Sequence, residues 1–276
     1  MLTPPLRVSP MLLVTIPFSH YNERARWALQ RFGVPFVERG YVPLFHFLGV
    51  IRHVGLRGGR SDRASTPLST PVLVTDDGER LRDSGQIVRY VSDRFSSAAT
   101  TLYPDELRGE IEEVERRAHD DIGPHTRRLV YHYLLSHPRL FAEIIRANVG
   151  RAQYTAFRVL QPLVTLGLRR ALGISEPRAR RSLERIRGVV AELDERLGER
   201  RYLVGERFTA ADLTVASLLA PVLVPESYGA KLPPLDALPS ELRAVVEETR
   251  ATRTGAQVMR VYAEERGARV GPDPRE

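Results

Sequence analysis

The chain has 276 residues, of which 42% are hydrophobic and 27% charged, so it is long enough for two modest domains and too apolar for global disorder. It contains no cysteine, which excludes disulfides, thiolate metal sites and a cysteine nucleophile. The formal net charge is +7, but the basic side chains are nearly all arginine and are interspersed with acids. No motif that reads a nucleic-acid groove accompanies them, so we expect no nucleic-acid partner.

The sequence also argues against a membrane or a metal as partner. No apolar run approaches the roughly 20 residues that cross a bilayer, and residues 1–10 lack the uninterrupted apolar core of a signal peptide. The seven histidines show neither an HExxH motif nor a comparable ligand spacing, so we expect no metal site. These features predict a cytoplasmic protein.

The first readable elements form a β-α-β unit. Residues 11–16 are a short β-branched apolar run, and apolar residues then recur at helical spacing over 22–32. Gly33 ends this helix, and 34–38 begin a second extended segment that must pair in parallel with the first. The loop 19–22 therefore lies at the carboxyl end of a strand beside a helix start, where ligands commonly bind.

A second informative stretch is 70–90, TPVLVTDDGERLRDSGQIVRY. It predicts a strand at 72–74, a tight turn at 76–78, a second short strand near Leu81 and then a helix. Asp83 and Ser84 are good N-cap residues, and the helix start that follows them offers unpaired N–H groups to a carboxylate.

Pro71 stands at the first position of the strand predicted in this stretch. Proline is tolerated there, and a cis bond after Thr70 would turn the preceding backbone toward a ligand. Between this strand and the opening unit, residues 41–69 predict an irregular second helix and a loop rich in glycine and arginine.

The second half of the chain is helical. Small and hydroxyl residues at 95–104 predict a linker, after which a charged helix over 110–118 continues past Pro124. Apolar patches over 141–172 predict more helix, and a regular apolar stripe over 183–197 predicts a core helix that ends at a glycine. One or two further helices are expected within 242–262.

A capping box lies between the last two of these regions. Thr209 and Asp212 have the spacing [ST]xxD just before the apolar run 213–219, inside the string YLVGERFTAADL. We expect both residues to start a helix and to have a structural role.

Three of these stretches together resemble the glutathione S-transferase superfamily of the cytosolic type. They are SHYNERARWAL at 19–29, the 70–90 stretch with its Thr-Pro and Asp-Ser pairs, and the capping string at 202–213. The resemblance implies a thioredoxin-like N-terminal domain with a mixed β-sheet over 11–95, then an all-helical domain over 103–265. Residues 1–10 and 267–276 are expected to be flexible.

The resemblance also implies a catalytic residue. Ser19 falls on the catalytic position of Ser- and Cys-type bacterial members, where its hydroxyl would donate a hydrogen bond to the thiolate of glutathione and lower the thiol pKa. Asn22 is the alternative, because bacterial members often have cysteine at that position. Both residue types also suit simple N-capping of the helix.

Four further residues would hold glutathione if the resemblance extends to binding. The Thr70 backbone before Pro71 would pair with the cysteinyl part, while Asp83 and Ser84 would hold the γ-glutamyl amine and carboxylate.

The resemblance specifies two other parts of the site less closely: the contact for the glycine carboxylate of glutathione and the pocket for the second substrate. Arg57 or Arg60 would meet the glycine carboxylate, or both are solvated loop arginines. Tyr131, Tyr154 and Phe157 are candidates for the second-substrate pocket by location alone.

The implied function is conjugation of glutathione, or of a related thiol, to a hydrophobic electrophile, with a homodimer as the usual assembly and no metal. The alternative from another class is a non-catalytic binding or scaffold protein of the same fold. An enzyme that uses a different cellular thiol is also compatible with these residues.

Overall fold

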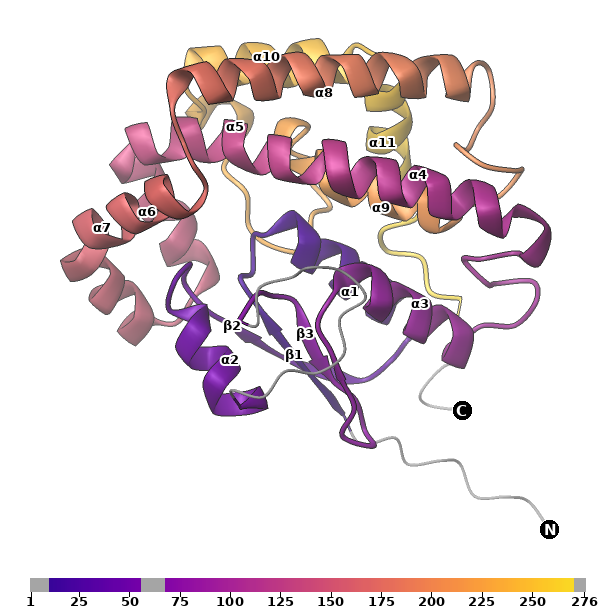
Figure 1. Cartoon of the computed structure of the whole chain (residues 1–276), viewed down its shortest axis with the longest axis horizontal. Coiled ribbons are helices and arrows are strands. Elements are labelled where there is room, and N and C mark those ends of the chain that lie inside the picture. The colour runs from indigo at the N-terminus through magenta and orange to yellow at the C-terminus, as the bar shows by residue number, and fades with distance from the viewer. Residues whose placement is uncertain (1–9, 56–67, 271–276) are drawn as a thin grey trace.

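The computed structural model describes residues 10–55 and 68–270. Its first part is an α/β unit (Figure 1) with four strands and three helices: β1 (Met11–Thr15), α1 (His20–Arg31), β2 (Phe36–Gly40), α2 (His46–Val54), β3 (Val72–Val74), β4 (Arg80–Leu81) and α3 (Ser84–Phe95). The strands predicted at 11–16 and 72–74, and the helix predicted to follow the Asp-Ser pair, are confirmed. The second helix, expected to be irregular, is a regular α-helix.

The four strands form one mixed sheet in the order β2-β1-β3-β4. Strand β1 pairs in parallel with β2 and antiparallel with β3, and β3 continues antiparallel into β4. The parallel pair predicted for the β-α-β opening is therefore confirmed. This mixed sheet is the thioredoxin-like arrangement, and its centre is β1, whose carboxyl end leads into α1.

Successive side chains of the central strands point to opposite faces of the sheet. Leu13 pairs with Leu73 across β1 and β3, and both are completely buried in the main core with α1 and α3. Their neighbours Val14 and Val72 are also a cross-strand pair, but they pack with Val50 of α2 in a separate small cluster. The sheet is thus covered on both faces, with α1 and α3 opposite α2.

The second part of the chain is helical, as the sequence predicts: α4 (Arg108–Asp121), α5 (Gly123–Ser136), α6 (Pro138–Asn148), α7 (Arg151–Ala171), α8 (Glu176–Leu197), α9 (Ala210–Leu219), α10 (Ser240–Arg250) and α11 (Arg253–Glu264). The helix expected to continue past Pro124 is instead two helices that meet at Ile122. Pro124 lies in the first turn of α5, where its missing N–H costs no intrahelical bond. Short 3-10 turns lie at 105–107, 220–222 and 235–237.

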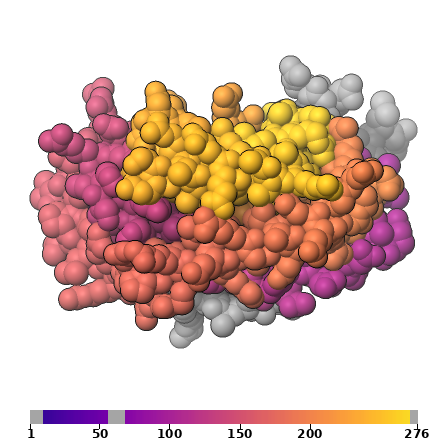
Figure 2. Space-filling model, turned by 90° about the horizontal axis from the view of Figure 1, so that it is seen from above, coloured from indigo at the N-terminus to yellow at the C-terminus, as the bar shows by residue number. Residues whose placement is uncertain are grey.

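The two parts share one hydrophobic core. Trp27 of α1 is fully buried, stacks on Phe208 and makes a tilted ring contact with Tyr262, both in the helical part. In the connection between the parts, Leu102 and Tyr103 are buried in the same core. Helix α8 and the C-terminal helices α10 and α11 cover the face of the molecule seen in Figure 2 (orange and yellow).

The C-terminal end of the described chain is held by the α/β part. Near the C-terminus, the Val270 N–H donates to the Arg31 carbonyl at 2.8 Å, so the last described residue lies against α1. Among the described residues, no helix is long and apolar enough to cross a membrane.

Candidate active site

The candidate site is an apolar cavity of about 380 Å³ between the α/β part and the helical part. The loop after β1 contributes Ser19 to its wall, the segment before β3 contributes Thr70, and α5 contributes Tyr131. Most other lining side chains are aliphatic or aromatic, which is the composition expected of a pocket for a hydrophobic ligand.

Ser19 is the N-cap residue of α1, with φ −76° and ψ 130°. Its carbonyl accepts the first helical bonds from the Asn22 and Glu23 N–H groups at 3.0 and 2.9 Å. Its half-buried side chain makes no capping hydrogen bond, so the hydroxyl is available to a ligand in the cavity. The helix N-terminus behind it favours a negative charge at this position.

Asn22 lies one turn further along α1 and is fully buried. Its amide nitrogen donates to the Ile16 carbonyl at 2.9 Å and to Thr70 Oγ1 at 3.3 Å. Its side chain thereby joins the end of β1 to the residue before Pro71, and it is not among the residues that line the cavity.

The Thr70–Pro71 peptide bond is cis. Thr70 and Ser69 both line the cavity opposite the start of α1, and Pro71 behind them is buried. The structure therefore brings Ser19 and Thr70, which are 51 positions apart in the printed sequence, to the walls of one cavity.

Asp83 and Ser84 lie at the start of α3, as predicted, but outside this cavity. Asp83 is the N-cap, and its Oδ1 accepts hydrogen bonds from the Gly85 and Gln86 N–H groups at 2.8 and 3.3 Å. It lines a separate polar hollow of about 470 Å³ beside Arg24. The Ser84 hydroxyl is buried and has no hydrogen-bond partner among the described residues.

The remaining sequence candidates divide into three groups. Arg57 and Arg60 lie outside the described residues. Tyr131 lines the cavity. Phe157 does not, because it is fully buried against Phe141 in a second hydrophobic cluster, and Tyr154 packs against that cluster from outside.

Two histidines line the cavity without carrying a charge at neutral pH. Burial, with a contribution from the nearby Arg127, lowers the pKa of His20 to about 3, and its Nε2 lies 3.0 Å from the Gly123 carbonyl. Burial lowers the pKa of His46 to about 4, and its Nδ1 accepts a hydrogen bond from the Leu44 N–H at 3.0 Å. Both rings therefore have structural partners and are not positioned as general bases.

Arg127 is a site residue that the sequence did not single out. It lies on α5, lines the cavity, and holds its guanidinium 5.7 Å from the centre of the Tyr21 ring. In the sequence it is one of two adjacent arginines in a helix, and only the packing of α5 against the start of α1 distinguishes it from its neighbour.

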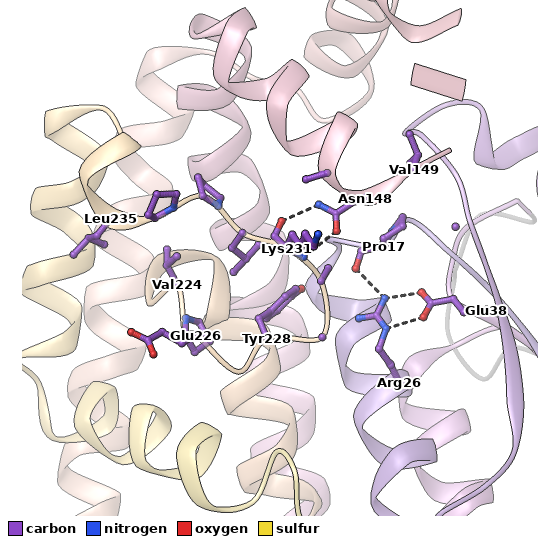
Figure 3. A pocket seen from close by; sticks show the side chains of 18 of the residues that line it. Pro17, Arg26, Glu38, Asn148, Val149, Val224, Glu226, Tyr228, Lys231 and Leu235 are labelled. Atoms are coloured by element: carbon purple, nitrogen blue, oxygen red, sulfur yellow. Dashed lines mark hydrogen bonds and ion pairs between the residues drawn. The ribbon is translucent and has the colours of Figure 1, made fainter. Parts of the chain in front are cut away.

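The segment 224–235 also lines a larger groove of about 1110 Å³ (Figure 3), which shares Val224, Tyr228, Leu232 and Pro233 with the apolar cavity. Several of its polar side chains already have protein partners: Arg26 donates to Glu38 and to the Pro17 carbonyl, and Asn148 pairs with the backbone of Lys231. Ser19 and Thr70 do not line it. We therefore take the smaller apolar cavity as the candidate site despite its size.

A network of buried charged side chains lies next to the cavity, and the sequence analysis did not predict it. Glu23 is completely buried, and its carboxylate accepts from Arg26 Nη1 at 2.7 Å, from Arg266 Nε at 2.6 Å and from the Gly229 N–H at 3.1 Å. The i, i+3 spacing of Glu23 and Arg26 was the available signal. This network ties the first helix to the C-terminal segment next to the cavity.

The capping box at Thr209 and Asp212 is present at the start of α9. Asp212 Oδ2 accepts from the Thr209 N–H at 3.1 Å, and Oδ1 accepts from the Leu203 N–H and from Gln257. In the part of the chain that the structure describes, no three acidic or histidine side chains gather closely enough to hold a metal ion.

A thioredoxin-like domain joined to an all-α domain, with a cavity at the start of α1 between them, is the architecture of a glutathione transferase. Family models agree with it: residues 13–99 match the N-terminal domain of glutathione S-transferase and residues 176–248 match its C-terminal domain. The two matches cover more than half of the chain, and the protein therefore belongs to the glutathione S-transferase superfamily.

Solved structures support the same fold at low sequence identity. The chain is similar to the glutathione transferase GSTFuA3 from Phanerochaete chrysosporium, with 16% identity, coverage of 94% of this chain and 98% of that one, and a TM-score of 0.58. It is also similar to the β-etherase LigF from Sphingobium sp. strain SYK-6, with 14% identity, 91% and 99% coverage and a TM-score of 0.57. A search of curated protein sequences returns no match.

Proposed function

We propose that this protein is a glutathione transferase-like enzyme, which joins the sulfur of glutathione, or of a related thiol, to a hydrophobic electrophile. The observation that carries the proposal is the Ser19 hydroxyl. It lines an apolar cavity at the N-terminus of α1 and is not used to cap that helix.

In this reaction the Ser19 hydroxyl donates a hydrogen bond to the thiolate sulfur, and the N-terminus of α1 stabilises the same negative charge. Both effects favour the ionised thiol and lower its pKa, so more thiolate is present at neutral pH. The thiolate then forms a carbon–sulfur bond with the electrophile, and the leaving group departs with its electron pair. Ser19 itself forms no covalent intermediate.

The position of Asn22 favours Ser19 as the sulfur contact. Both hydrogen bonds of the Asn22 amide nitrogen are made to protein atoms, at Ile16 and Thr70, and the side chain does not line the cavity. Its role in this proposal is to hold the Thr70 segment against the start of α1.

The start of α3 would hold the γ-glutamyl end of the thiol. Asp83 uses Oδ1 for capping, while Oδ2 makes no hydrogen bond among the described residues and remains for an ammonium group. The buried Ser84 hydroxyl lacks a partner, which a carboxylate would supply. The Thr70 backbone would pair with the cysteinyl part.

The direct test is product formation. Purified protein is incubated with glutathione and chlorodinitrobenzene, and the conjugate is identified by mass spectrometry, with cysteine and coenzyme A as alternative thiols. We expect the glutathione conjugate to form faster with the protein than without it. We expect Ser19→Ala to lower kcat/KM by about 10²–10³-fold. Absence of any thiol conjugate would reject the enzyme.

The second candidate is a non-catalytic binding protein of the same fold. Two observations favour it: Asp83 lies outside the cavity that Ser19 lines, and the Ser84 hydroxyl is buried. An enzyme would need both residues to hold the same thiol that contacts Ser19. Saturable glutathione binding by calorimetry without conjugate formation is the outcome that would select it.

We also propose a homodimer, in which the α/β part of one subunit packs on the helical part of the other. Light scattering after size exclusion would then give twice the 31.1 kDa chain mass. The chain mass itself would contradict the dimer. The cytoplasmic location stays a prediction.

A further inference from the structure

On its α5 side, the cavity beside Ser19 is lined by two polar side chains. Arg127 and Tyr131 both lie on α5, four residues apart, and both line the cavity. Residues at this spacing lie on one face of a helix, with Cβ atoms about 5–6 Å apart. A guanidinium and a phenol are therefore presented side by side toward the same space.

Neither side chain is engaged elsewhere by a polar partner. Among the described residues, the Arg127 guanidinium makes no hydrogen bond or ion pair, and its Tyr21 contact leaves its N–H donors unused. The Tyr131 hydroxyl makes no hydrogen bond either, while the Tyr131 ring is held by an edge contact with Phe141. Burial raises the pKa of Tyr131, so its phenol stays protonated and is a hydrogen-bond donor at neutral pH.

The rest of the described cavity wall supplies no other charge. His20 and His46 are neutral because burial lowers the pKa of each to about 3 and about 4. Tyr228 donates its hydroxyl to the Phe18 carbonyl at 3.2 Å and is not available. Arg127 is thus the only side chain of the described lining that carries a charge at pH 7.

A lone cation and a neutral donor in an apolar cavity match one kind of ligand. An anion with two acceptor oxygens pairs with a guanidinium and accepts from a phenol, and the aliphatic walls require that the rest of the ligand be apolar. A carboxylate on a small aromatic or aliphatic body meets both conditions.

We propose that Arg127 and Tyr131 form a carboxylate-binding pair that selects, as the second substrate, a small apolar electrophile bearing a carboxylate. This inference rests on the proposed function, because it assigns the electrophile of that reaction. The carboxylate is held at α5 while the electrophilic carbon lies toward Ser19. The thiolate bonds to that carbon, and a halide or similar group leaves with its electron pair.

Two electrophiles of the same size test the pair: para-chloro-meta-nitrobenzoate, which is an anion, and para-chloro-meta-nitrobenzamide, which is neutral. With glutathione, kcat/KM for each is divided by its own uncatalysed rate, so that differences in intrinsic reactivity cancel. We expect the wild type to prefer the benzoate, and Arg127→Met to reduce the benzoate-to-benzamide ratio by about 10- to 100-fold.

Three further variants make the result specific. Arg127→Lys keeps the charge but loses the planar fork, so we expect an intermediate ratio. Tyr131→Phe removes one neutral donor, so we expect a smaller loss of about 3- to 10-fold. Arg139→Met removes an exposed arginine on α6 that does not line the cavity, and we expect its ratio to equal that of the wild type.

The outcomes separate this inference from the proposed function. If Arg127→Met raises the KM for glutathione and leaves the ratio unchanged, Arg127 serves the thiol and the inference is overturned. If the wild type conjugates chlorodinitrobenzene but neither of these two compounds, the inference is overturned and the proposed function stands. If it conjugates none of the three, the proposed function fails, and calorimetric binding of the two compounds decides the carboxylate-binding part of the inference. Benzoate binding that is lost in Arg127→Met while benzamide binding is unaffected then supports it, and equal binding of both compounds overturns it.

Discussion

The Asn22 amide nitrogen donates a hydrogen bond to Thr70 Oγ1 at 3.3 Å and so joins the first turn of α1 to the residue that precedes the cis proline. The same nitrogen donates to the Ile16 carbonyl at 2.9 Å. One buried amide therefore fixes the two segments that carry Ser19 and Thr70 into the cavity.

Replacement of Asn22 by alanine tests this linking role. We expect Asn22→Ala to lower the free energy of unfolding by about 1–3 kcal/mol, because it leaves a buried carbonyl without its donor. Asn148→Ala is the matched control: its amide nitrogen also donates two hydrogen bonds, here to the Ile144 and Lys231 carbonyls, but at a more exposed position, and we expect about 1 kcal/mol or less. Urea denaturation measures both, and equal losses would contradict the special role of Asn22.

Glu23 anchors the network below the cavity. Glu23→Gln leaves Arg266 buried without its paired carboxylate and leaves Arg26 with Glu38 as its only carboxylate partner, and we expect a loss of about 3–5 kcal/mol in the free energy of unfolding. The control is Glu248→Gln, which breaks an exposed ion pair with Arg187 and is expected to cost less than about 1 kcal/mol. A Glu23 variant as stable as the control would show that the network contributes little.

The neutral His20 predicts a pH dependence. Because burial depresses its folded pKa from 6.5 to about 3, the unfolded chain binds the proton more tightly, and the stability from this group is complete above pH 6.5 and lost toward pH 3. His20→Gln can still donate to the Gly123 carbonyl but does not titrate in this range.

We therefore compare the unfolding free energies of wild type and His20→Gln between pH 7 and pH 4. The wild type should lose stability relative to the variant by roughly 1.4 kcal/mol per pH unit below 6.5. Parallel pH profiles would mean that His20 is not buried as a neutral ring.

The elements that could be predicted from sequence depend on local signals. The strand at 72–74 is a β-branched run bounded by a proline and a turn, and Asp83 and Thr209 are N-cap residues before apolar stripes. Each signal lies within a few residues of the element that it specifies. The break at Ile122 was missed because Pro124 suits the first turn of a new helix as well as it ends an old one.

The parts of the site that were missed depend on distant partners. Arg266 meets Glu23 across 243 positions, and Arg127 reaches the cavity only because α5 packs against the start of α1. Neither arginine differs in its local sequence from the many others in the chain. The separation of Asp83 from the cavity is likewise a property of how α3 packs, which periodicity alone does not specify.

The most direct test of the proposed chemistry is the ultraviolet thiolate absorbance of bound glutathione as a function of pH, measured for the wild type, Ser19→Ala and Asn22→Ala. A free cysteine thiol has a pKa near 8.5. We predict thiolate well below that pH for the wild type and Asn22→Ala, and a pKa about 1–2 units higher for Ser19→Ala, which loses a hydrogen bond to the charged sulfur. Bound glutathione that titrates like free thiol, or a shift abolished by Asn22→Ala alone, would contradict the assignment of Ser19.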